Sequence, residues 1–392
     1  MTGRPLNCGY VPLVDCAPLI VAQELRFAAD EGITLNLLRQ PSWAALRDLL
    51  ALGHLDVAHM LSPMPTAMSL GLSGPAAQID ALMVLSANGT VIGVSTDMAN
   101  AMRATGWTGG FDNPRATLTP LLTALDRPLR VGVPFPYSMH RLLFDYWVRN
   151  APVVGASDIR IVTQPPPLMA EAVQAGEIDV FCVGEPWGSV AVTAGVGELV
   201  LPGAAIWANA PEKVLAARRT WVDDNAESVG ALMRAVVRAA QWLDQPDNRM
   251  LAIEILARSA HLDLPVAAIE HALTGRFATR AGADPVHVPN FVRFHTNATT
   301  FPWRSQAAWI GSEISRLTGI DKTHAISTAQ STMRPDCYRT HLGAMGVDMP
   351  GASAKIEGAL THPTAVASTR GQMILGPDAF FDGKTYDFAP KN

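Results

Sequence analysis

The sequence is poor in cysteine and has no long apolar run. Its four cysteines, Cys8, Cys16, Cys182 and Cys337, form no CxxC pair and lack the spacing of a zinc site. In a chain of 392 residues we expect them to be reduced residues of the core rather than disulfides. No apolar stretch approaches the ~18 residues that cross a bilayer, so no membrane-spanning segment is predicted.

Positive charge is also scarce. The chain carries 30 Lys and Arg residues against 35 Asp and Glu residues, which gives a formal net charge of −5. A protein that binds the phosphate backbone of a nucleic acid needs a basic face, so we expect no direct contact with nucleic acid. Apolar residues make up 48% and charged residues 17%, which is typical of a globular protein, and the length suggests two compact units.

The start of the chain does not have the pattern of an export signal. Such a signal has a basic start, roughly 7–15 apolar residues and a small-residue cleavage site. Here a strand-like run already begins at Leu6. If Met1 is the natural start, we expect the protein to stay in the cytoplasm.

Signatures of common enzymes are missing as well. The sequence contains no GxSxG nucleophile motif, no Walker A loop and no HExxH helix. The ten histidines form no pair spaced by four residues with a carboxylate partner. We therefore predict no catalytic residues, no cofactor and no resident metal.

What the sequence does contain is an alternation of strand-like and helix-like segments that occurs twice. In the first half the strand-like runs are residues 7–12, 34–38 and 56–60, with helix-like runs between them. The rhythm restarts after Pro128, and both halves end in a similar phrase, GHLDVA at 53–58 and GEIDVF at 176–181. This order is typical of mostly parallel sheets with helices on their faces, and it predicts two similar α/β lobes.

The rest of the chain completes the predicted organisation. Residues 226–273 have few glycine or proline breaks and are predicted to be helical. Residues 323–392 are rich in glycine, proline and alanine and are predicted to form an irregular tail over the surface or in a cleft. We expect one lobe to comprise residues 1–125 and 215–392, and the other residues 126–214.

Two predicted helix starts would face the crevice between these lobes. Ligands of such sheets bind at the carboxyl ends of the strands; Ser42 and Trp43 follow one strand, and Ser138 and His140 follow another. Helix N-termini offer free N–H groups and about half a positive charge, which suits an anion. Trp43 and His140 can add hydrogen-bond donors, although each could instead be an ordinary core or surface residue.

Further candidates lie outside these helix starts. Asn88-Gly89-Thr90 contains the Asn-Gly pair of a hairpin turn, but it could equally place backbone N–H groups and small polar side chains at the cleft. Glu185 ends a predicted strand and could orient a basic residue. Lys213, taken alone, would be a solvated surface charge.

Several phrases resemble the nitrate- and bicarbonate-binding proteins of bacterial ABC importers. They are residues 15–19, 42–44, 47–48, 58–65, 165–169, 181–187 and 211–213, with an echo at 380–384. The similarity runs from about Leu6 to about Ala278. It implies a type II periplasmic-binding-protein fold, in which two α/β lobes joined by two crossovers close on the ligand.

The resemblance also implies a ligand site. The implied residues are Trp43, Asn88, Gly89, Thr90, His140 and Lys213, with Ser42, Pro166 and Glu185 in support. Nitrate-binding members carry counterparts of Trp43, His140 and Lys213, whereas bicarbonate-binding members lack the histidine. Nitrate is a weakly basic monovalent anion, so the site needs several donors and about one net positive charge, which Lys213 would supply.

Together with the missing export signal, the resemblance implies a cytoplasmic sensor of nitrate or nitrite. Such sensors pair with an RNA-binding antiterminator of the ANTAR type and release it on anion binding, so that nitrate assimilation genes are read through. Neither nucleic acid nor membrane is a direct partner of the sensor. Two alternatives stay open: the solute-binding subunit of an importer, and an enzyme on the same fold, such as a thiamine-precursor synthase.

Overall fold

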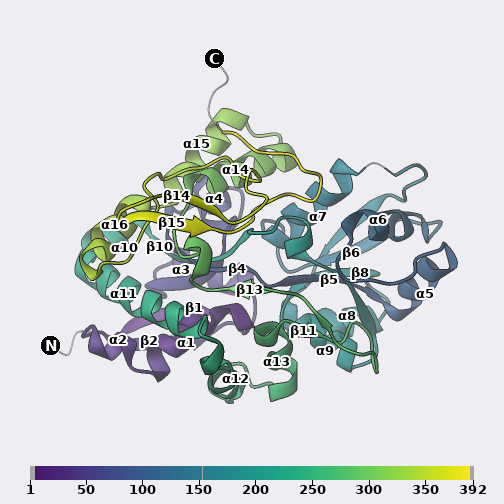
Figure 1. Ribbon diagram of the computed structural model, residues 1–392, viewed down its shortest axis with the longest axis horizontal. Helices are drawn as coiled ribbons and strands as arrows, with labels where there is room; N and C mark the ends of the chain where they lie inside the picture. The colour runs from purple at the N-terminus through teal and green to yellow at the C-terminus, as the bar shows by residue number, and fades with distance from the viewer. Residues whose placement is uncertain (1–4, 152, 389–392) are drawn as a thin grey trace.

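The computed structural model describes residues 5–151 and 153–388. Two mixed sheets, each with helices packed on it, form two lobes that lie side by side in Figure 1. The two-lobed α/β architecture expected from the sequence is confirmed. In both sheets a parallel group of three strands is extended by antiparallel strands.

The first lobe is built on a six-stranded sheet in the order β13-β4-β10-β3-β1-β2. Its strands are β1 (Leu6–Tyr10), β2 (Leu35–Arg39), β3 (Val57–Leu61), β4 (Ile79–Asn88), β10 (Pro211–Arg218) and β13 (Val292–Arg293). Strand β10 runs antiparallel between β3 and β4. All five residues of β3 are buried, because both of its neighbours and the helices on either face cover this central strand.

The second lobe is built on a five-stranded sheet in the order β7-β6-β8-β5-β9. Its strands are β5 (Thr90–Ser95), β6 (Leu129–Val133), β7 (Ile159–Thr163), β8 (Val180–Gly184) and β9 (Gly197–Pro202). Strand β5 lies antiparallel between β8 and β9. The chain thus passes into the second sheet at Gly89, before the expected boundary at residue 125, because β5 enters that sheet before the strand-helix rhythm restarts. It returns between β9 and β10, close to the expected boundary at residue 214.

Helices pack on both sheets and connect their strands. They are α1 (Ala17–Glu24), α2 (Phe27–Asp30), α3 (Trp43–Ala51), α4 (Met64–Ser69), α5 (Thr96–Ala104), α6 (Pro114–Thr123), α7 (Met139–Asn150), α8 (Met169–Gln174), α9 (Trp187–Thr193), α10 (Arg219–Asp224), α11 (Ala226–Leu243), α12 (Arg249–Ala257) and α13 (Val266–Thr274). The helical prediction for residues 226–273 is confirmed by α11 to α13. Ser42 and Ser138 cap α3 and α7, since each hydroxyl accepts the N–H of the residue three positions on, at 3.2 Å.

Two crossovers join the lobes, and Asn88 ties them together. Asn88 and Gly89 have φ values of +61° and +91°, and they turn the chain from β4 into the other sheet rather than into a hairpin. The Asn88 amide donates to the carbonyl of Ala208 at 3.0 Å and accepts from the N–H of Ala210 at 3.1 Å. The two crossovers are therefore hydrogen-bonded to each other at a single residue.

The region after residue 300 is more regular than predicted. It contains α14 (Arg304–Thr318), α15 (Lys322–Thr332) and α16 (Pro335–Leu342), so the expectation of an irregular tail from residue 323 is wrong for the first twenty residues. Helix α15 packs so closely on α14 that a Cβ atom on Gly311 would lie 2.7 Å from the carbonyl oxygen of Ala325. This contact between small residues stabilises α15 without an apolar stripe in its sequence.

The last part of the chain wraps across both lobes. Apart from the hairpin β14 (Thr364–Ser368) and β15 (Gly371–Leu375), it is largely irregular, as predicted. The N–H of Phe381 donates to the carbonyl of Ile206 at 2.9 Å, and the hydroxyl of Tyr146 on α7 donates to Asp382 at 3.1 Å. In Figure 1 this yellow segment extends from β15 toward α7.

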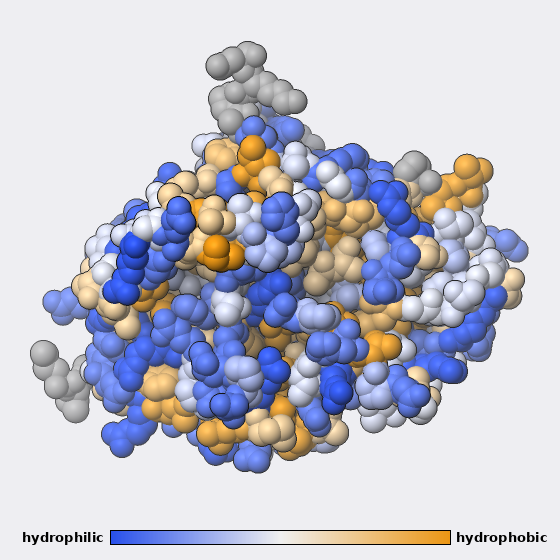
Figure 2. All heavy atoms as spheres, in the orientation of Figure 1, coloured by the Kyte–Doolittle hydropathy of each residue, from blue (hydrophilic) through white to orange (hydrophobic). Residues whose placement is uncertain are grey.

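The outer surface is mixed in character. Figure 2 shows hydrophobic residues on one face in small separate groups among hydrophilic ones. Within residues 5–151 and 153–388, no helix is both long and apolar enough to cross a membrane.

Candidate functional site

The two lobes meet at the carboxyl ends of their central strands. The N–H of Val14, after β1, donates to the carbonyl of Glu185, just after β8, at 2.9 Å. The indole N–H of Trp187 donates to the carbonyl of Pro12 at 2.8 Å. These two bonds hold the lobes together over the sheet edges at which ligands of α/β proteins bind.

A lysine of β10 is fully buried at this edge of the first sheet. Lys213 Nζ donates to Asp15 Oδ2 at 2.6 Å and to Glu212 Oε1 at 2.9 Å. The ammonium group also lies 5.5 Å from the centre of the Trp43 ring, within the range of a cation–π contact. A side chain that would be a surface charge on its own is thus the centre of a buried polar cluster.

Two histidines extend this cluster toward both lobes. His59, in the middle of β3, donates from Nε2 to Asp15 Oδ1 at 2.9 Å, and its ring packs on Trp43 with 5.5 Å between ring centres. His140, in the first turn of α7, places Nδ1 3.3 Å from Glu212 Oε1, in contact but outside hydrogen-bond geometry. The two helix starts that the sequence places at the cleft therefore reach the same cluster from opposite lobes.

Ser86, on β4, lies opposite Lys213 in the sheet. We name this set the lysine cluster; it consists of Asp15, Trp43, His59, Ser86, His140, Glu212 and Lys213. Several of its buried polar atoms have no hydrogen-bond partner among the described residues: Trp43 Nε1, His59 Nδ1, Ser86 Oγ, both ring nitrogens of His140 and Glu212 Oε2. An unpartnered buried polar group costs about 1–3 kcal/mol, and native proteins keep few of them. Their concentration around one lysine indicates a binding site for a small polar ligand.

The charges at the centre of the lysine cluster cancel. Burial by itself would raise the pKa of Asp15, but the charge of Lys213 and the hydrogen bond from His59 outweigh burial and lower that pKa to about 2. Burial works against the charged form of Lys213 too, but its two carboxylate partners outweigh this effect and raise its pKa. Asp15 and Lys213 are therefore a neutral ion pair at physiological pH.

The remaining titratable groups of the lysine cluster are close to neutral. Burial, opposed by Lys213, raises the pKa of Glu212 to about 7. Burial, together with the charge of Lys213, places the pKa of His140 well below its ordinary value, and burial also lowers the pKa of His59. The closed cluster thus lacks the net positive charge expected from the sequence, and an anion would bring a proton with it.

A cavity of about 550 Å³ lies between the lobes at the mouth of the cleft. It is lined by Pro12, Arg39, Gln40, Pro41 and Ser42 of the first lobe and by Pro165, Pro167 and Leu168 of the second. Ser42 thus lines this entrance while it caps α3. Pro166, which lies between Pro165 and Pro167 in the sequence, is buried and does not line the cavity.

The structure places Asn88, Gly89 and Thr90 at the first crossover. The Asn88 amide is bonded to the second crossover, and the N–H of Gly89 donates to the carbonyl of Phe291 at 2.9 Å. Thr90 is buried at the start of β5. These residues join the lobes in the observed structure, and their contact with a ligand stays a prediction.

Glu185 lies beside the bonds that close the lobes. Its Oε2 atom accepts the N–H of Ser189 in α9 at 3.2 Å, while Oε1 has no partner among the described residues. Burial raises the pKa of this carboxyl to about 7, against the effect of the bonds from Ser189. Glu185 therefore acts on α9 in the closed form, and the expected role of orienting a basic residue stays a prediction.

Four members of the lysine cluster were not recognised from the sequence as candidates: Asp15, His59, Ser86 and Glu212. Asp15 stands just beyond the carboxyl end of β1, and Glu212 directly precedes Lys213. Asp15 carried a usable signal, because a charged residue just beyond the carboxyl end of a parallel strand is brought to the ligand edge of the sheet. Glu212 carried none, since it lies at the start of the antiparallel strand β10. His59 gave no such signal, since it lies inside an apolar strand.

The cysteines have the properties of core residues. All four are free, and Cys8, Cys16 and Cys182 are buried, as expected. Burial raises the pKa of the thiols of Cys16 and Cys182 far above the ordinary value, which leaves no thiolate to act as a nucleophile. Within the described part of the chain, no group of three or more His, Cys, Asp and Glu side chains is placed to hold a metal ion.

Two lobes, two crossovers and a buried polar cluster between them define the class of two-lobed solute-binding proteins. A solved structure, the periplasmic nitrate-binding protein NrtA from Synechocystis PCC 6803, superposes with a TM-score of 0.83 over 98% of this chain and 95% of that one, at 27% identity. Residues 2–257 match the NMT1-like family, and the chain belongs to this family.

Curated relatives come from cyanobacterial transport systems. The nitrate/nitrite binding protein NrtA of Nostoc sp. is 27% identical over 97% of this chain and 82% of its own length. The nitrate import ATP-binding protein NrtC of Synechocystis sp. is 32% identical over 86% of this chain, and the chain spans about half the length of that relative. These relatives are named for nitrate binding and nitrate import, and neither is named as a thiamine-precursor synthase, the enzyme considered as an alternative.

Proposed function

We propose that this protein binds nitrate or nitrite between its lobes as the solute-binding component of an ABC-type importer. The observation that carries the proposal is the set of unpartnered buried atoms around Lys213, above all Trp43 Nε1 and the ring nitrogens of His140. Relatives named for nitrate binding and nitrate import support the same ligand.

The chemistry of the lysine cluster suits a small planar anion. Trp43 offers a flat wall and an indole N–H, and the neutral ring of His140 offers one further N–H. The ammonium group of Lys213 carries the positive charge nearest to the anion. The carboxyl of Glu212, once protonated, adds a donor and removes a negative charge from the site. Nitrate would then enter a site with several donors and no net negative charge, because the charges of Asp15 and Lys213 cancel.

Bicarbonate is a second candidate ligand. Unlike nitrate, bicarbonate carries a hydroxyl, and the unpartnered Glu212 Oε2 atom could accept its hydrogen bond. A further relative, 31% identical over 79% of this chain and 45% of its own length, is named a bicarbonate transport ATP-binding protein. The two ligands differ in their pH dependence, because bicarbonate favours ionised Glu212 and nitrate favours the protonated form.

The cytoplasmic sensor with an ANTAR partner is the alternative role. The relatives described above are named for binding and import, so the importer role has the better support. The sensor role, the antiterminator partner and the cytoplasmic location stay predictions. The importer role adds a partner, the membrane permease of the importer.

Calorimetry with nitrate, nitrite and bicarbonate, with sulfate as a comparison anion, tests the ligand. We expect one nitrate or nitrite per chain, and the absence of heat with both anions would overturn the proposal. The two roles are separated by adding the protein to the reconstituted permease and, in parallel, to the antiterminator. Nitrate-dependent stimulation of ATP hydrolysis supports the importer, whereas nitrate-dependent dissociation of the antiterminator supports the sensor.

A further inference from the structure

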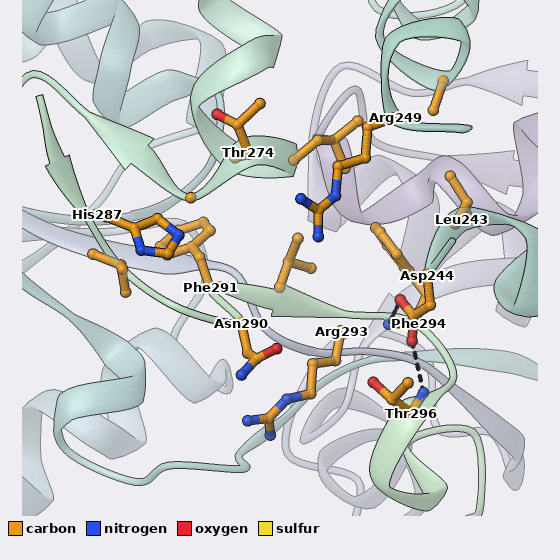
Figure 3. A pocket seen from close by; sticks show the side chains of 16 residues that line it. Leu243, Asp244, Arg249, Thr274, His287, Asn290, Phe291, Arg293, Phe294 and Thr296 are labelled. Carbon is orange, nitrogen blue, oxygen red and sulfur yellow. Dashed lines mark hydrogen bonds between the residues drawn. The ribbon is translucent and has the colours of Figure 1, made fainter. Parts of the chain in front are cut away.

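A second cavity lies outside the cleft between the lobes. It has a volume of about 140 Å³ and is enclosed by the end of α11, the start of α12, the end of α13 and the segment 287–296. Figure 3 shows the Arg249 side chain extending from α12 into the middle of this cavity, with Thr274 and His287 to one side and Leu243 to the other. Arg249 is exposed, so its guanidinium group stands in a small cavity that is open to solvent.

A second guanidinium group lies in the wall of the same cavity. Arg293, in β13, is half-buried, and its one hydrogen bond among the described contacts is from Nη1 to Asn209 Oδ1 at 3.0 Å. A guanidinium carries five N–H donors, so most of the hydrogen-bonding capacity of Arg293 is unused. Burial lowers its pKa, opposed by the charge of Asp244, which is what a desolvated cation without an ion-pair partner undergoes.

The carboxylate of Asp244, the acidic residue that lines this cavity, is already hydrogen-bonded to backbone N–H groups. Asp244 accepts the N–H groups of Phe294, His295 and Thr296 at 3.1, 2.9 and 2.6 Å. Its carboxylate therefore fixes the segment beside the cavity and forms no hydrogen bond with either arginine. Two guanidinium groups against one engaged carboxylate leave an excess positive charge in the cavity.

We propose that this cavity is a binding site for a small anion that carries a carboxylate or phosphoryl group. The planar fork of Arg249 matches the paired oxygens of such a group, which it can hold by two parallel hydrogen bonds. Asn290, which Figure 3 shows beside Arg293, and His287 supply further donors around the cavity. The volume of about 140 Å³ suits a small metabolite.

The position of the cavity connects it to both crossovers. Strand β13 pairs with the end of β4, where Val292 lies opposite Asn88, and the N–H of Gly89 donates to the carbonyl of Phe291. Arg293 bonds to Asn209, next to the second crossover contact at Ala210. An anion in the cavity would therefore act on the segments about which the lobes move, and we infer that it changes the ligand affinity of the cleft.

Binding is tested by calorimetry on the full chain with two probes, inorganic phosphate and succinate. We expect one of them to bind with a stoichiometry of one, and R249A to weaken that binding at least tenfold. The affinity of R249K for the probe should lie between those of the wild type and R249A, because lysine keeps the charge and loses the paired hydrogen bonds. R280A is the control, since Arg280 is an exposed arginine outside the lining and its removal should change nothing.

Failure of both probes to bind at millimolar concentration would overturn the proposal, as would equal binding by R249A and the wild type. This measurement needs no nitrate and is independent of the proposed function. Regulation of the cleft, which does rest on the proposed function, is tested by nitrate titrations with and without the bound probe. We expect the nitrate dissociation constant to change at least threefold, and equal values would overturn the regulatory role.

Discussion

Lys213 Nζ lies 2.6 Å from Asp15 Oδ2, and both side chains are buried between two histidines. A solvated lysine would contribute charge to an anion site, but this one is already paired within the protein. Its removal therefore affects the fold as well as the site, because a buried carboxylate without a cation is strongly unfavourable.

We predict that K213M lowers the free energy of unfolding by about 3 kcal/mol and abolishes nitrate binding. The double variant D15N/K213M should recover much of the lost stability, since it removes the uncompensated charge, but it should not recover binding. Urea denaturation and calorimetry on the same samples measure both effects. A K213M protein as stable as the wild type would contradict the buried ion pair.

Nitrate affinity should depend on pH through Glu212. Burial raises its pKa to about 7, so the carboxyl is mostly neutral at pH 6 and mostly ionised at pH 8. Because an ionised Glu212 repels nitrate, affinity should fall as pH rises above 7, by as much as tenfold per pH unit if each nitrate binds with one proton. E212Q should flatten this dependence in calorimetric titrations at pH 6, 7 and 8.

The comparison variant for this pH effect is E185Q. Burial also raises the pKa of Glu185 to about 7, but its carboxyl faces Ser189 rather than Lys213. E185Q should therefore keep the slope of affinity against pH. If nitrate affinity became independent of pH in E185Q but kept its pH dependence in E212Q, the proton would be bound by Glu185 and this mechanism would be contradicted.

Two buried tryptophans allow a matched test of the ligand site. Trp43 Nε1 and Trp107 Nε1 are both buried without a partner among the described residues, but Trp107 lies in the core of the second lobe. W43F should weaken nitrate binding about tenfold, equivalent to about 1.4 kcal/mol, because it removes a donor and keeps an aromatic wall. W107F should leave the calorimetric affinity unchanged; equal losses in both variants would point to an indirect effect.

Asn88 should be important for the stability of the crossovers. N88A removes both side-chain bonds to the second crossover and places alanine at φ +61°, so we expect a loss of about 2–3 kcal/mol. N88G removes the same bonds without the strain and should be about 1 kcal/mol more stable than N88A. Urea denaturation measures the difference, and equal stabilities would show that the backbone at this crossover relaxes.

The helix starts at Trp43 and His140 were predictable because they rest on a local rule. Each follows a predicted strand, and the carboxyl ends of parallel strands mark the ligand edge of a sheet. Asp15 and Lys213, by contrast, are 198 residues apart, and their pairing depends on how β10 inserts beside β3. The sequence of β10 does not indicate which strands flank it, so the neutral pair could not be foreseen.

In two places the local sequence pattern did not predict the observed structure, because packing against distant residues determines it. Asn88-Gly89 has the sequence of a hairpin turn, but β4 and β5 pair with strands of different sheets, and the same left-handed backbone serves as a crossover. Helix α15 has no apolar stripe, because its contact with Gly311 depends on small residues. In both cases the deciding partner lies far away in the sequence or offers no hydrophobic pattern.

The C-terminal segment gives the molecule a third connection between its lobes. The two crossovers, hydrogen-bonded to each other at Asn88, would form the hinge between the lobes. Rotation about a hinge displaces nearby atoms little and distant atoms more. The C-terminal segment is bonded near the hinge, from Phe381 to Ile206, and farther out on α7, from Asp382 to Tyr146. Opening of the lobes about the crossovers would therefore have to break the bond between Tyr146 and Asp382, together with the ion pair between Arg149 of α7 and Glu313 of α14.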